Sequence, residues 1–231
     1  AVYVEMKQLH LRNTFKPRKW SKLSKDERAK LLESHLFLKK KRCGTIKART
    51  VAGGNKQRDY ISKQDVSSPT VSTQALLLSC LIDAYEGRDV MTIDIPNAFI
   101  QTKVDDPKDR VLIKLKGTLV DILVEIAPDV YKEYVHIDPK GNKIIVAECL
   151  NAIYGTLMAC LLFFMKFCAS LKELGFTPNQ YEPCVQNRMI HGAQQTICFH
   201  VDDCKASHVN PAANDQLVAE LKKEYEHIMP D

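Results

Sequence analysis

Thr196-Ile-Cys-Phe-His-Val-Asp-Asp203 is an apolar stretch that runs directly into two adjacent aspartates. Together with a second short stretch at Lys205–His208, it predicts a β-hairpin that carries the acidic pair at its tip. A third aspartate, Asp94, lies in another predicted strand, Val90–Ile95, which Pro96 ends. Carboxylates that lie close together repel one another unless a cation offsets their charge. The residues alone leave two interpretations open, a metal site and an ordinary turn rich in aspartate.

Outward from this hairpin, the apolar periodicity predicts an α+β protein with an antiparallel sheet backed by helices. A capping box at Ser24-Lys-Asp-Glu27 opens one of the helices. In the helix expected at 72–85, apolar residues recur at helical spacing; they are Leu76, Leu77, Cys80, Leu81 and Ala84. Helices are expected at residues 2–12, 24–34, 72–85, 156–174 and 214–228, and strands at 36–42, 45–51, 90–95, 111–115, 134–137, 143–146, 185–190, 195–201 and 205–208.

Positive charge is concentrated at the front of the chain. Residues 1–58 contain 17 lysines and arginines against 4 acidic residues, and the remainder contains 16 against 24. The net charge of +5 hides this asymmetry. A basic front half favours a polyanionic partner such as nucleic acid, although lysine-rich helices also serve as plain soluble faces.

The eight cysteines include no Cys-x-x-Cys pair. Four of them, Cys80, Cys149, Cys160 and Cys168, lie among apolar residues, so we predict buried free thiols. Free thiols fit a reducing compartment better than a disulfide framework. The uncharged run 149–165, which no other run exceeds in length, is shorter than the roughly 20 apolar residues of a membrane span. We therefore expect a buried helix there and no association with a membrane.

Six short segments, taken in order, carry a family resemblance. They are Lys47-Ala-Arg-Thr-Val-Ala52, Ser68-Pro-Thr70, Asp94-Ile-Pro-Asn-Ala-Phe99, Leu150-Asn-Ala-Ile-Tyr-Gly155, Gly175-Phe176 and His200-Val-Asp-Asp203. The third resembles the Asp-x-x-x-Ala-Phe/Tyr motif of a polymerase palm, and the last resembles the Tyr-Val-Asp-Asp hairpin. Each segment alone is a weak signal, but six in order over almost the whole chain resemble a copia-type retrotransposon reverse transcriptase.

This resemblance implies an RNA-directed DNA polymerase that works with two Mg²⁺ ions, or with Mn²⁺ in their place. Two such ions sit about 3.5–4 Å apart and stabilise both the attacking and the leaving oxygen. Asp94 and Asp202 would bridge the ions, and Asp203 would be a weaker third ligand. These three are the expected catalytic and metal-binding residues. The primer 3′-hydroxyl would attack the α-phosphorus of an incoming deoxynucleotide, and pyrophosphate would leave.

Four further residues are expected to bind the nucleotide. Lys47 and Arg49 alternate along a predicted strand, so they point to the same face. In the family this part of the fingers closes on the triphosphate, and the Arg49 fork suits phosphate. Phe99 corresponds to the residue beneath the sugar, where a ring would exclude a ribose 2′-hydroxyl, and Ala98 leaves room for backbone contact. The plainer alternatives are solvated strand charges for the first pair and a core aromatic for Phe99.

The resemblance also predicts a domain plan, a reverse-transcriptase-like palm with a basic fingers subdomain. Residues 1–88 would form the fingers, 89–115 the first part of the palm, 116–160 a connecting region, and 161–231 the palm with the catalytic hairpin and a terminal helix. Because the first residue is Ala1, we expect a segment of a longer Pol polyprotein, with its RNase H and integrase regions as partners. The other expected partners are an RNA template, a DNA or RNA primer and dNTPs. The expected location is a cytoplasmic virus-like particle or the nucleus.

Two departures from the family pattern keep a rival interpretation open. His200 replaces the expected tyrosine, and the segment Tyr154–Phe164 lacks the usual Lys-Gln-Ala-Pro-Arg. Both favour a catalytically inactive relic that binds nucleic acid, whereas the three intact aspartates favour the enzyme. A third interpretation, an unrelated interaction domain with a basic face, predicts that Asp94 lies far from Asp202 and Asp203.

Overall fold

A computed structural model describes residues 1–62, 64–226 and 228–230, and the chain divides into two compact units. The first unit comprises residues 1–66 and 99–159, and the second comprises 67–98 and 160–231. The boundaries differ from the predicted ones: residues 67–88 join the second unit, and 99–115 join the first. The names fingers and palm for these units stay predictions.

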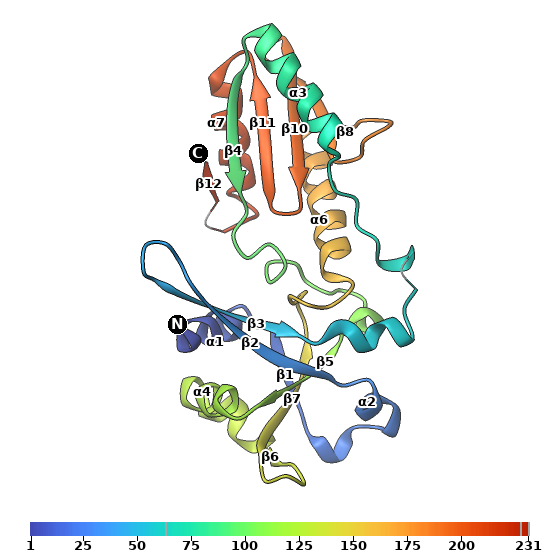
Figure 1. The fold of residues 1–231 in the computed structure, drawn as a ribbon, viewed down its shortest axis with the longest axis vertical. Helices are drawn as coiled ribbons and strands as arrows, with labels where there is room; N and C mark the ends of the chain where they lie inside the picture. Colours follow the sequence, from blue (N-terminus) through green and yellow to red (C-terminus); the bar gives the residue numbers. More distant parts are fainter. Residues whose placement is uncertain (63, 227, 231) are drawn as a thin grey trace. The chain divides into compact units, whose positions relative to one another are not determined.

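The first unit is built on a mixed sheet with the strand order β1-β7-β5-β2-β3 and with β6 paired to β7. Only β2 and β5 run parallel within it. Helices α1 and α4 pack beside one another, and the core includes Met6, Leu32, Ile113 and Ile145. The elements are α1 (Val2–Leu11), β1 (Phe15–Arg18), α2 (Lys25–Ala29), β2 (Leu32–Lys40), β3 (Ile46–Ala52), β5 (Leu112–Lys116), α4 (Thr118–Ile126), α5 (Pro128–Tyr131), β6 (His136–Ile137) and β7 (Lys143–Cys149) (Figure 1).

The β2–β3 hairpin confirms the predicted basic hairpin, and Gly44 takes the positive φ of +85° at its turn. The capping box at Ser24 is also present, with Glu27 as its partner. The predicted extent of the following helix is wrong, because α2 ends at Ala29 and the chain continues as β2. Residues 32–34 pair with β5 and β3, and this pairing overrides their helical pattern.

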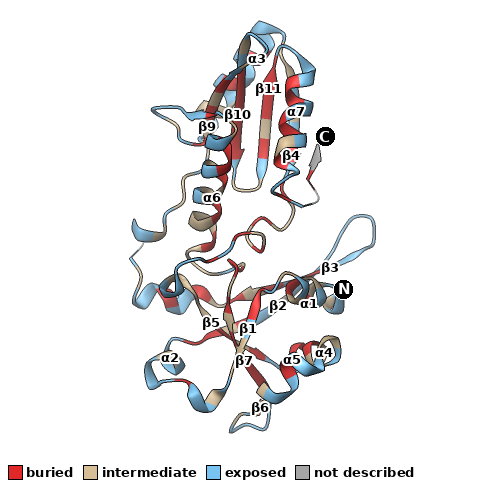
Figure 2. Ribbon diagram, turned by 180° about the vertical axis from the view of Figure 1, so that it is seen from behind, coloured by how far each residue is buried: buried red, intermediate tan, exposed pale blue. Residues whose placement is uncertain are grey.

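The second unit is an antiparallel sheet with the order β12-β4-β11-β10-β9-β8. Phe167 of α6 packs on one face of this sheet, where its ring contacts that of Phe199 on β10. Helix α7 lies against β4 and β11 (Figure 2). The predicted class, α+β with an antiparallel sheet backed by helices, is confirmed. The elements are α3 (Thr73–Glu86), β4 (Asp89–Asp94), α6 (Ala159–Glu173), β8 (Thr177–Pro178), β9 (Val185–Ile190), β10 (Ala193–His200), β11 (Asp203–His208), α7 (Pro211–Leu221) and β12 (Met229–Pro230).

Helix α3 presents an unexpected side to the sheet. Its buried residues are Ser79 and Asp83, and Asp83 forms an ion pair with Lys205 on β11. Leu77 and Leu81, two of the apolar residues at helical spacing, are 60% and 68% exposed, and Cys80, which was predicted to be buried, is exposed as well. Apolar residues surround much of this helix, so their spacing predicts a helix without fixing its orientation. The buried ion pair fixes it instead.

Two other expectations need correction. The last helix is α7 at Pro211–Leu221, shorter than the predicted 214–228, and α4 was not predicted at all. All eight cysteines are free, but of the four that were predicted to be buried free thiols, only Cys149 is buried. Among the described residues, no helix combines the length and the apolar character needed to cross a bilayer.

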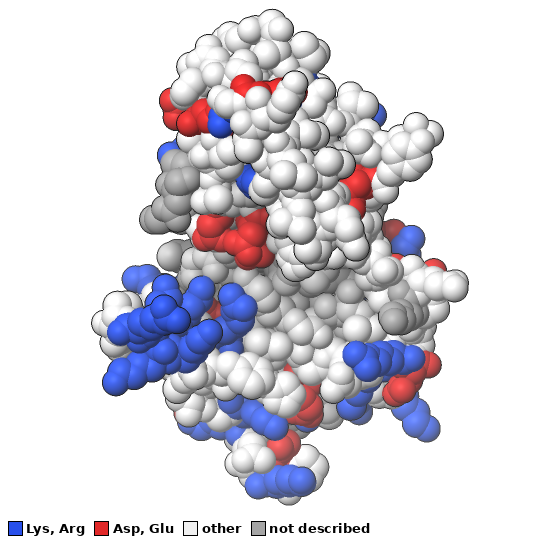
Figure 3. All heavy atoms as spheres, turned by 45° about the horizontal axis from the view of Figure 1, so that its top comes forward, with Lys and Arg blue, Asp and Glu red and all other residues white. Residues whose placement is uncertain are grey.

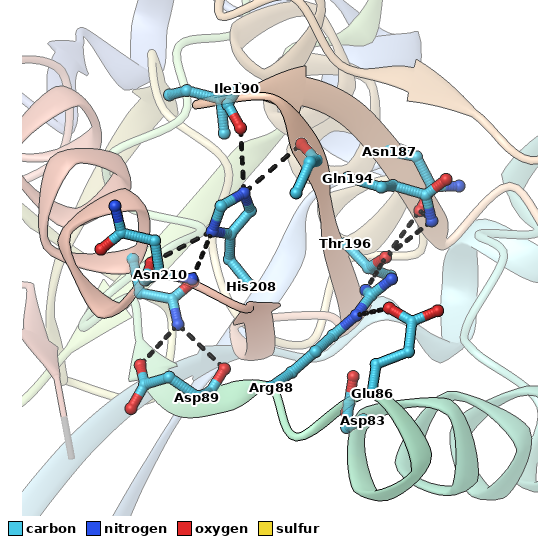
Figure 4. A network of polar contacts seen from close by, with 12 residues as sticks. Asp83, Glu86, Arg88, Asp89, Asn187, Ile190, Gln194, Thr196, His208 and Asn210 are labelled. Atoms are coloured by element: carbon cyan, nitrogen blue, oxygen red, sulfur yellow. Dashed lines mark hydrogen bonds and ion pairs between the residues drawn. The ribbon is translucent and has the colours of Figure 1, made fainter.

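A polar network fixes where β4 enters the sheet (Figure 4). At the start of β4, the Asn214 amide donates to an Asp89 carboxylate oxygen at 2.8 Å. Arg88, next to it, donates to the Thr196 hydroxyl on β10 at 2.9 Å. His208, the last residue of β11, hydrogen-bonds with the Ile190 carbonyl at 3.0 Å. These contacts tie the start of β4 to α7 and β10, and the end of β11 to the end of β9.

Candidate active site

Asp94 and Asp203 occupy directly opposite positions at the far end of this sheet. Strand β4 ends at Asp94, strand β11 begins at Asp203, and the two residues are paired in the antiparallel register. Paired residues of an antiparallel sheet project to the same face, with Cβ atoms about 4.5–5.5 Å apart. His200, the last residue of β10, pairs with Asp203 in turn. His200, Asp203 and Asp94 therefore form one row across three strands.

Asp202 lies in the two-residue turn between β10 and β11. Its carbonyl accepts a hydrogen bond from the Ile95 N–H at 3.1 Å, which ties the turn to the end of β4. The other turn residue, Val201, has a φ of +60°. A single positive φ at the first turn position marks a type II′ turn, where glycine is the usual residue. For a β-branched residue this conformation is strained, and strain of this kind is concentrated at functional sites.

The three carboxylates make this end of the sheet strongly acidic. Asp94 and Asp203 are exposed, and Asp202 is half-buried. Within the described part of the chain, no lysine or arginine forms a salt bridge with Asp94 or Asp203. Burial and the negative charges of all three aspartates raise the pKa of the neighbouring Cys204 thiol. The unrelated interaction domain required the two acidic segments to lie far apart, and the register rules that out.

The donor chemistry of this cluster suits a hard divalent cation. Magnesium prefers oxygen ligands and often takes one or two carboxylates together with phosphate oxygens. In the side-chain arrangement of the structure, no three His, Cys, Asp or Glu residues among those described already form a ligand set. The backbone places Asp94 opposite Asp203 and ties the turn at Asp202 to the end of β4, and side-chain rotation would have to complete the ligand set.

A hollow of about 460 Å³ opens beside the acidic row, on the face of the sheet that α3 covers. Its walls include Leu76 and Cys80 from the helix and Asp94, His200 and Asp203 from the strands. The acidic residues therefore border an accessible space, and an approaching group meets carboxylates on one side and apolar side chains on the other.

The predicted phosphate-binding cations lie in the first unit, on the β2–β3 hairpin. Lys47 and Arg49 are both exposed and, as predicted, share one face of β3, opposite Lys39 and Phe37 respectively. Towards the tip come further exposed cations without an intervening acid, at Lys39, Lys40, Lys41 and Arg42. Figure 3 shows their side chains gathered into a basic surface.

Phe99 also belongs to the first unit and makes a contact that the sequence did not predict. Its ring lies 4.8 Å from that of Tyr154, and the Arg49 guanidinium stacks on the same tyrosine at 4.0 Å. Tyr154 thus links two of the predicted nucleotide-binding residues. The Leu-Tyr-Gly resemblance was the only signal for it, because spacing alone gives no reason to join positions 49, 99 and 154. Ala98 is buried in the second unit.

Sequence comparison places the chain beside retroelement polyproteins. Over 228 residues it is 26% identical to the truncated transposon Ty1-A Gag-Pol polyprotein of Saccharomyces cerevisiae, which covers 98% of this chain and 17% of the relative. The similarity confirms the resemblance to copia-type retrotransposon Pol proteins. The transposon Ty1-DR5 Gag-Pol polyprotein of the same yeast matches over 228 residues at the same identity, 11% of its length. The chain thus spans less than a fifth of either Gag-Pol relative, and no protein-family model matches it.

Among solved structures, the chain is similar to two yeast telomerases. Apo telomerase from Candida tropicalis gives a TM-score of 0.48 at 10% identity, over 100% of this chain and 48% of the telomerase. Telomerase from Candida albicans in complex with a fragment of telomeric RNA gives 0.46 at 10% identity, over 99% and 45%. Both TM-scores are below 0.5, so the structural similarity is distant.

Proposed function

We propose that the chain is the nucleotidyl-transfer part of an RNA-directed DNA polymerase of a copia-type LTR retrotransposon. The observation that carries the proposal is the cross-strand pairing of Asp94 with Asp203, beside the strained turn that holds Asp202. These residues come from segments more than 100 positions apart, so their meeting is a property of the fold. The similarity to Ty1 Gag-Pol polyproteins supports the same reaction class.

The acidic cluster would hold the metal ions. Asp94, Asp202 and Asp203 supply oxygen ligands only, which suits Mg²⁺ and also Mn²⁺. When bound, such ions lower the pKa of an attacking hydroxyl and stabilise a leaving phosphate. The protein's own contribution is to fix three carboxylates on a rigid sheet end, next to a hollow that a primer terminus and a nucleotide can enter.

The first unit would supply the nucleotide and nucleic-acid contacts. Arg49 and Lys47 on β3 would donate hydrogen bonds to the triphosphate, and Phe99 would exclude a ribose 2′-hydroxyl. The cations near the hairpin tip would bind the phosphates of an RNA template or its primer, because phosphate contacts dominate such affinity. The remaining regions of a Pol polyprotein, RNase H and integrase, are the proposed protein partners, and a cytoplasmic virus-like particle or the nucleus is the proposed location.

Primer extension tests the proposal directly. The wild-type chain, given a labelled DNA primer on an RNA template, dNTPs and Mg²⁺, is expected to lengthen the primer, and Asp202→Asn is expected to lose at least about 100-fold in rate. Asp215→Asn, at an exposed position on α7, is the matched control and should keep the wild-type rate. An Asp202→Asn variant as fast as the wild type would remove Asp202 from the mechanism.

The inactive relic gives a different pattern in the same experiment. It binds the primer–template with salt-sensitive affinity but adds no nucleotide with either Mg²⁺ or Mn²⁺. His200 in place of tyrosine is the feature that favours it, since this residue stands in the row with Asp203 and Asp94. Extension by His200→Tyr with no extension by the wild type would assign the defect to that position.

A further inference from the structure

Tyr154 stands between two residues to which the proposed function gives separate tasks. The carbon at the centre of the Arg49 guanidinium lies 4.0 Å from the centroid of the Tyr154 ring. The Phe99 ring lies 4.8 Å from the same ring, tilted by 51°. A cation over a ring face and a tilted aromatic pair are both favourable arrangements. Tyr154 therefore contacts both Arg49, which is expected to bind the triphosphate, and Phe99, which is expected to exclude a ribose 2′-hydroxyl.

The backbone of Tyr154 is locked to the strand that carries Arg49. The Ala52 N–H, at the end of β3, donates to the Tyr154 carbonyl at 2.7 Å. The next residue, Gly155, has a φ of +89°, and a Cβ built on it would lie 2.1 Å from the Ala52 carbonyl oxygen. A Cβ on Gly54 would likewise lie 2.0 Å from the Gly155 carbonyl oxygen. This close packing fixes the origin of the Tyr154 side chain relative to β3.

The stack leaves the hydrogen-bonding edge of Arg49 available. A guanidinium stacks through its planar face and donates its N–H groups in its own plane, so both interactions can occur together. None of the described residues accepts a hydrogen bond from the Arg49 guanidinium. The side chain is thus held in place by the Tyr154 ring while its donors remain ready for an anion with phosphate geometry.

We infer that Tyr154 is a positioning residue that couples triphosphate recognition by Arg49 to sugar discrimination by Phe99. The inference rests on the proposed function and adds to it a dependence between two contacts. Loss of the Tyr154 ring frees both neighbours, so the affinity for a dNTP and the preference over the matching ribonucleotide fall together. The ligand class is a deoxynucleoside triphosphate.

The test compares equilibrium binding of dTTP and UTP to the wild-type chain on a primer–template with binding to its variants. Tyr154→Leu, which keeps an apolar side chain without a ring, is expected to weaken dTTP binding about tenfold. It should also reduce the dTTP-to-UTP preference at least about threefold. Arg49→Ala combined with Tyr154→Leu should be no weaker than Arg49→Ala alone, because coupled residues are not additive. Tyr154→Phe, which keeps the ring, should restore most of the affinity.

A matched control and a spectroscopic measurement complete the design. Tyr134→Leu removes a tyrosine of the same unit that has its own lysine partner, Lys19, and should leave both affinities at the wild-type value. In NMR spectra, the Arg49 side-chain protons should carry a ring-current shift that Tyr154→Leu abolishes and Tyr154→Phe retains. Three results would each overturn the inference. The first is folded Tyr154→Leu protein with unchanged affinity and preference, and the second is additive losses in the double variant. The third is a wild type that binds neither nucleotide. A wild type that binds dTTP with the expected coupling but extends no primer would refute the proposed function alone.

Discussion

Asp94 on β4 and Asp203 on β11 face one another as direct cross-strand partners. Like charges at opposite positions of an antiparallel pair destabilise it, by several tenths of a kcal/mol up to about 1 kcal/mol. A sheet that retains this repulsion at an exposed end is less stable than it would be with a neutral residue there. The cost has a physical reason if the pair serves to bind a cation that relieves it.

Removing one of these charges should therefore have opposite effects with and without Mg²⁺. In EDTA, the free energy of unfolding of Asp203→Asn is expected to exceed that of the wild type by up to about 1 kcal/mol. Its melting temperature should therefore be higher. Millimolar Mg²⁺ should then raise the melting temperature of the wild type, because a ligand of the folded state stabilises it. Millimolar Mg²⁺ should raise the melting temperature of Asp203→Asn much less. Differential scanning fluorimetry measures both shifts.

The exposed residue Asp215 on α7 provides the control for this comparison. Asp215→Asn removes the same charge from the same unit, away from the acidic row, and should respond to Mg²⁺ as the wild type does. A wild-type melting temperature that Mg²⁺ leaves unchanged, with Asp203→Asn less stable than the wild type in EDTA, would contradict the assigned metal site.

The hairpin that carries Asp202 and Asp203 could be predicted from the sequence, but the register in which β4 pairs with β11 could not. Alternating apolar residues before Asp202 predict the β10–β11 hairpin, because strand period and turn chemistry are local properties. The position of β4 beside β11 depends on pairing between residues far apart in the sequence, from Asp89 with His208 to Asp94 with Asp203. A slip of one residue would turn Asp94 to the opposite face. No short stretch of sequence contains that information.

Helix α3 and Tyr154 illustrate the same limit in other ways. Apolar residues at several helical faces predict a helix at 72–85, but the ion pair of Asp83 with Lys205 decides which face is buried. Tyr154 gains its role only because β3 brings Arg49 to it and the chain after β4 brings Phe99. Roles that arise from side chains of three separate segments require the tertiary structure.

The basic hairpin leads to a prediction about salt. Each phosphate that a lysine or arginine neutralises releases counterions, so the logarithm of the binding constant falls with the logarithm of salt by roughly 0.7–0.9 per contact. The double variant Lys40→Ala/Arg42→Ala removes two exposed cations near the tip. It should weaken binding of a primer–template and lower the salt slope by up to about 2. Fluorescence anisotropy across a salt series measures the slope.

Lys140, an exposed lysine in the β6–β7 turn, is the control for that experiment. Lys140→Ala should leave the slope at its wild-type value, although it lowers the net charge as well. If Lys140→Ala and a single hairpin substitution reduce the slope equally, the effect comes from overall charge, and the hairpin is not the binding surface.

Glu5 on α1 gives a prediction about pH. Its carboxylate accepts a hydrogen bond from the Thr50 N–H on β3 at 2.9 Å. Burial nevertheless raises the pKa of Glu5 above its ordinary value, more than this bond and the nearby cations Arg49 and Lys47 lower it. The folded protein therefore binds this proton more tightly than the unfolded chain does. The destabilising effect of ionised Glu5 is present near pH 7 and disappears as the pH falls through the raised pKa towards the unfolded value.

Glu5→Gln tests this without removing the acceptor, since the amide oxygen can still receive the Thr50 hydrogen bond. The variant is expected to be more stable than the wild type at pH 7, and the difference should shrink towards zero near pH 4. Urea unfolding of both proteins at several pH values measures it, and the comparison cancels the acid sensitivity of the other carboxylates. A difference that grows as the pH falls would show that the pKa of Glu5 is lowered in the folded state.

Gly155 should be among the least replaceable residues of the first unit. A Cβ there would lie 2.1 Å from the Ala52 carbonyl oxygen and 2.5 Å from a Val51 methyl carbon, and the φ of +89° is unfavourable for any other residue. Gly155→Ala is expected to cost about 3 kcal/mol or more of unfolding free energy, since it combines a backbone clash with left-handed strain. Gly175→Ala separates the two causes, because Gly175 has a similar φ of +86° but, its chain neighbours apart, no atom of the described residues lies within 4 Å of the added Cβ. It should cost only about 1–2 kcal/mol, the strain term alone. Equal losses in the two variants would mean that the chain around Ala52 moves aside, and that Tyr154 is not rigidly anchored to β3.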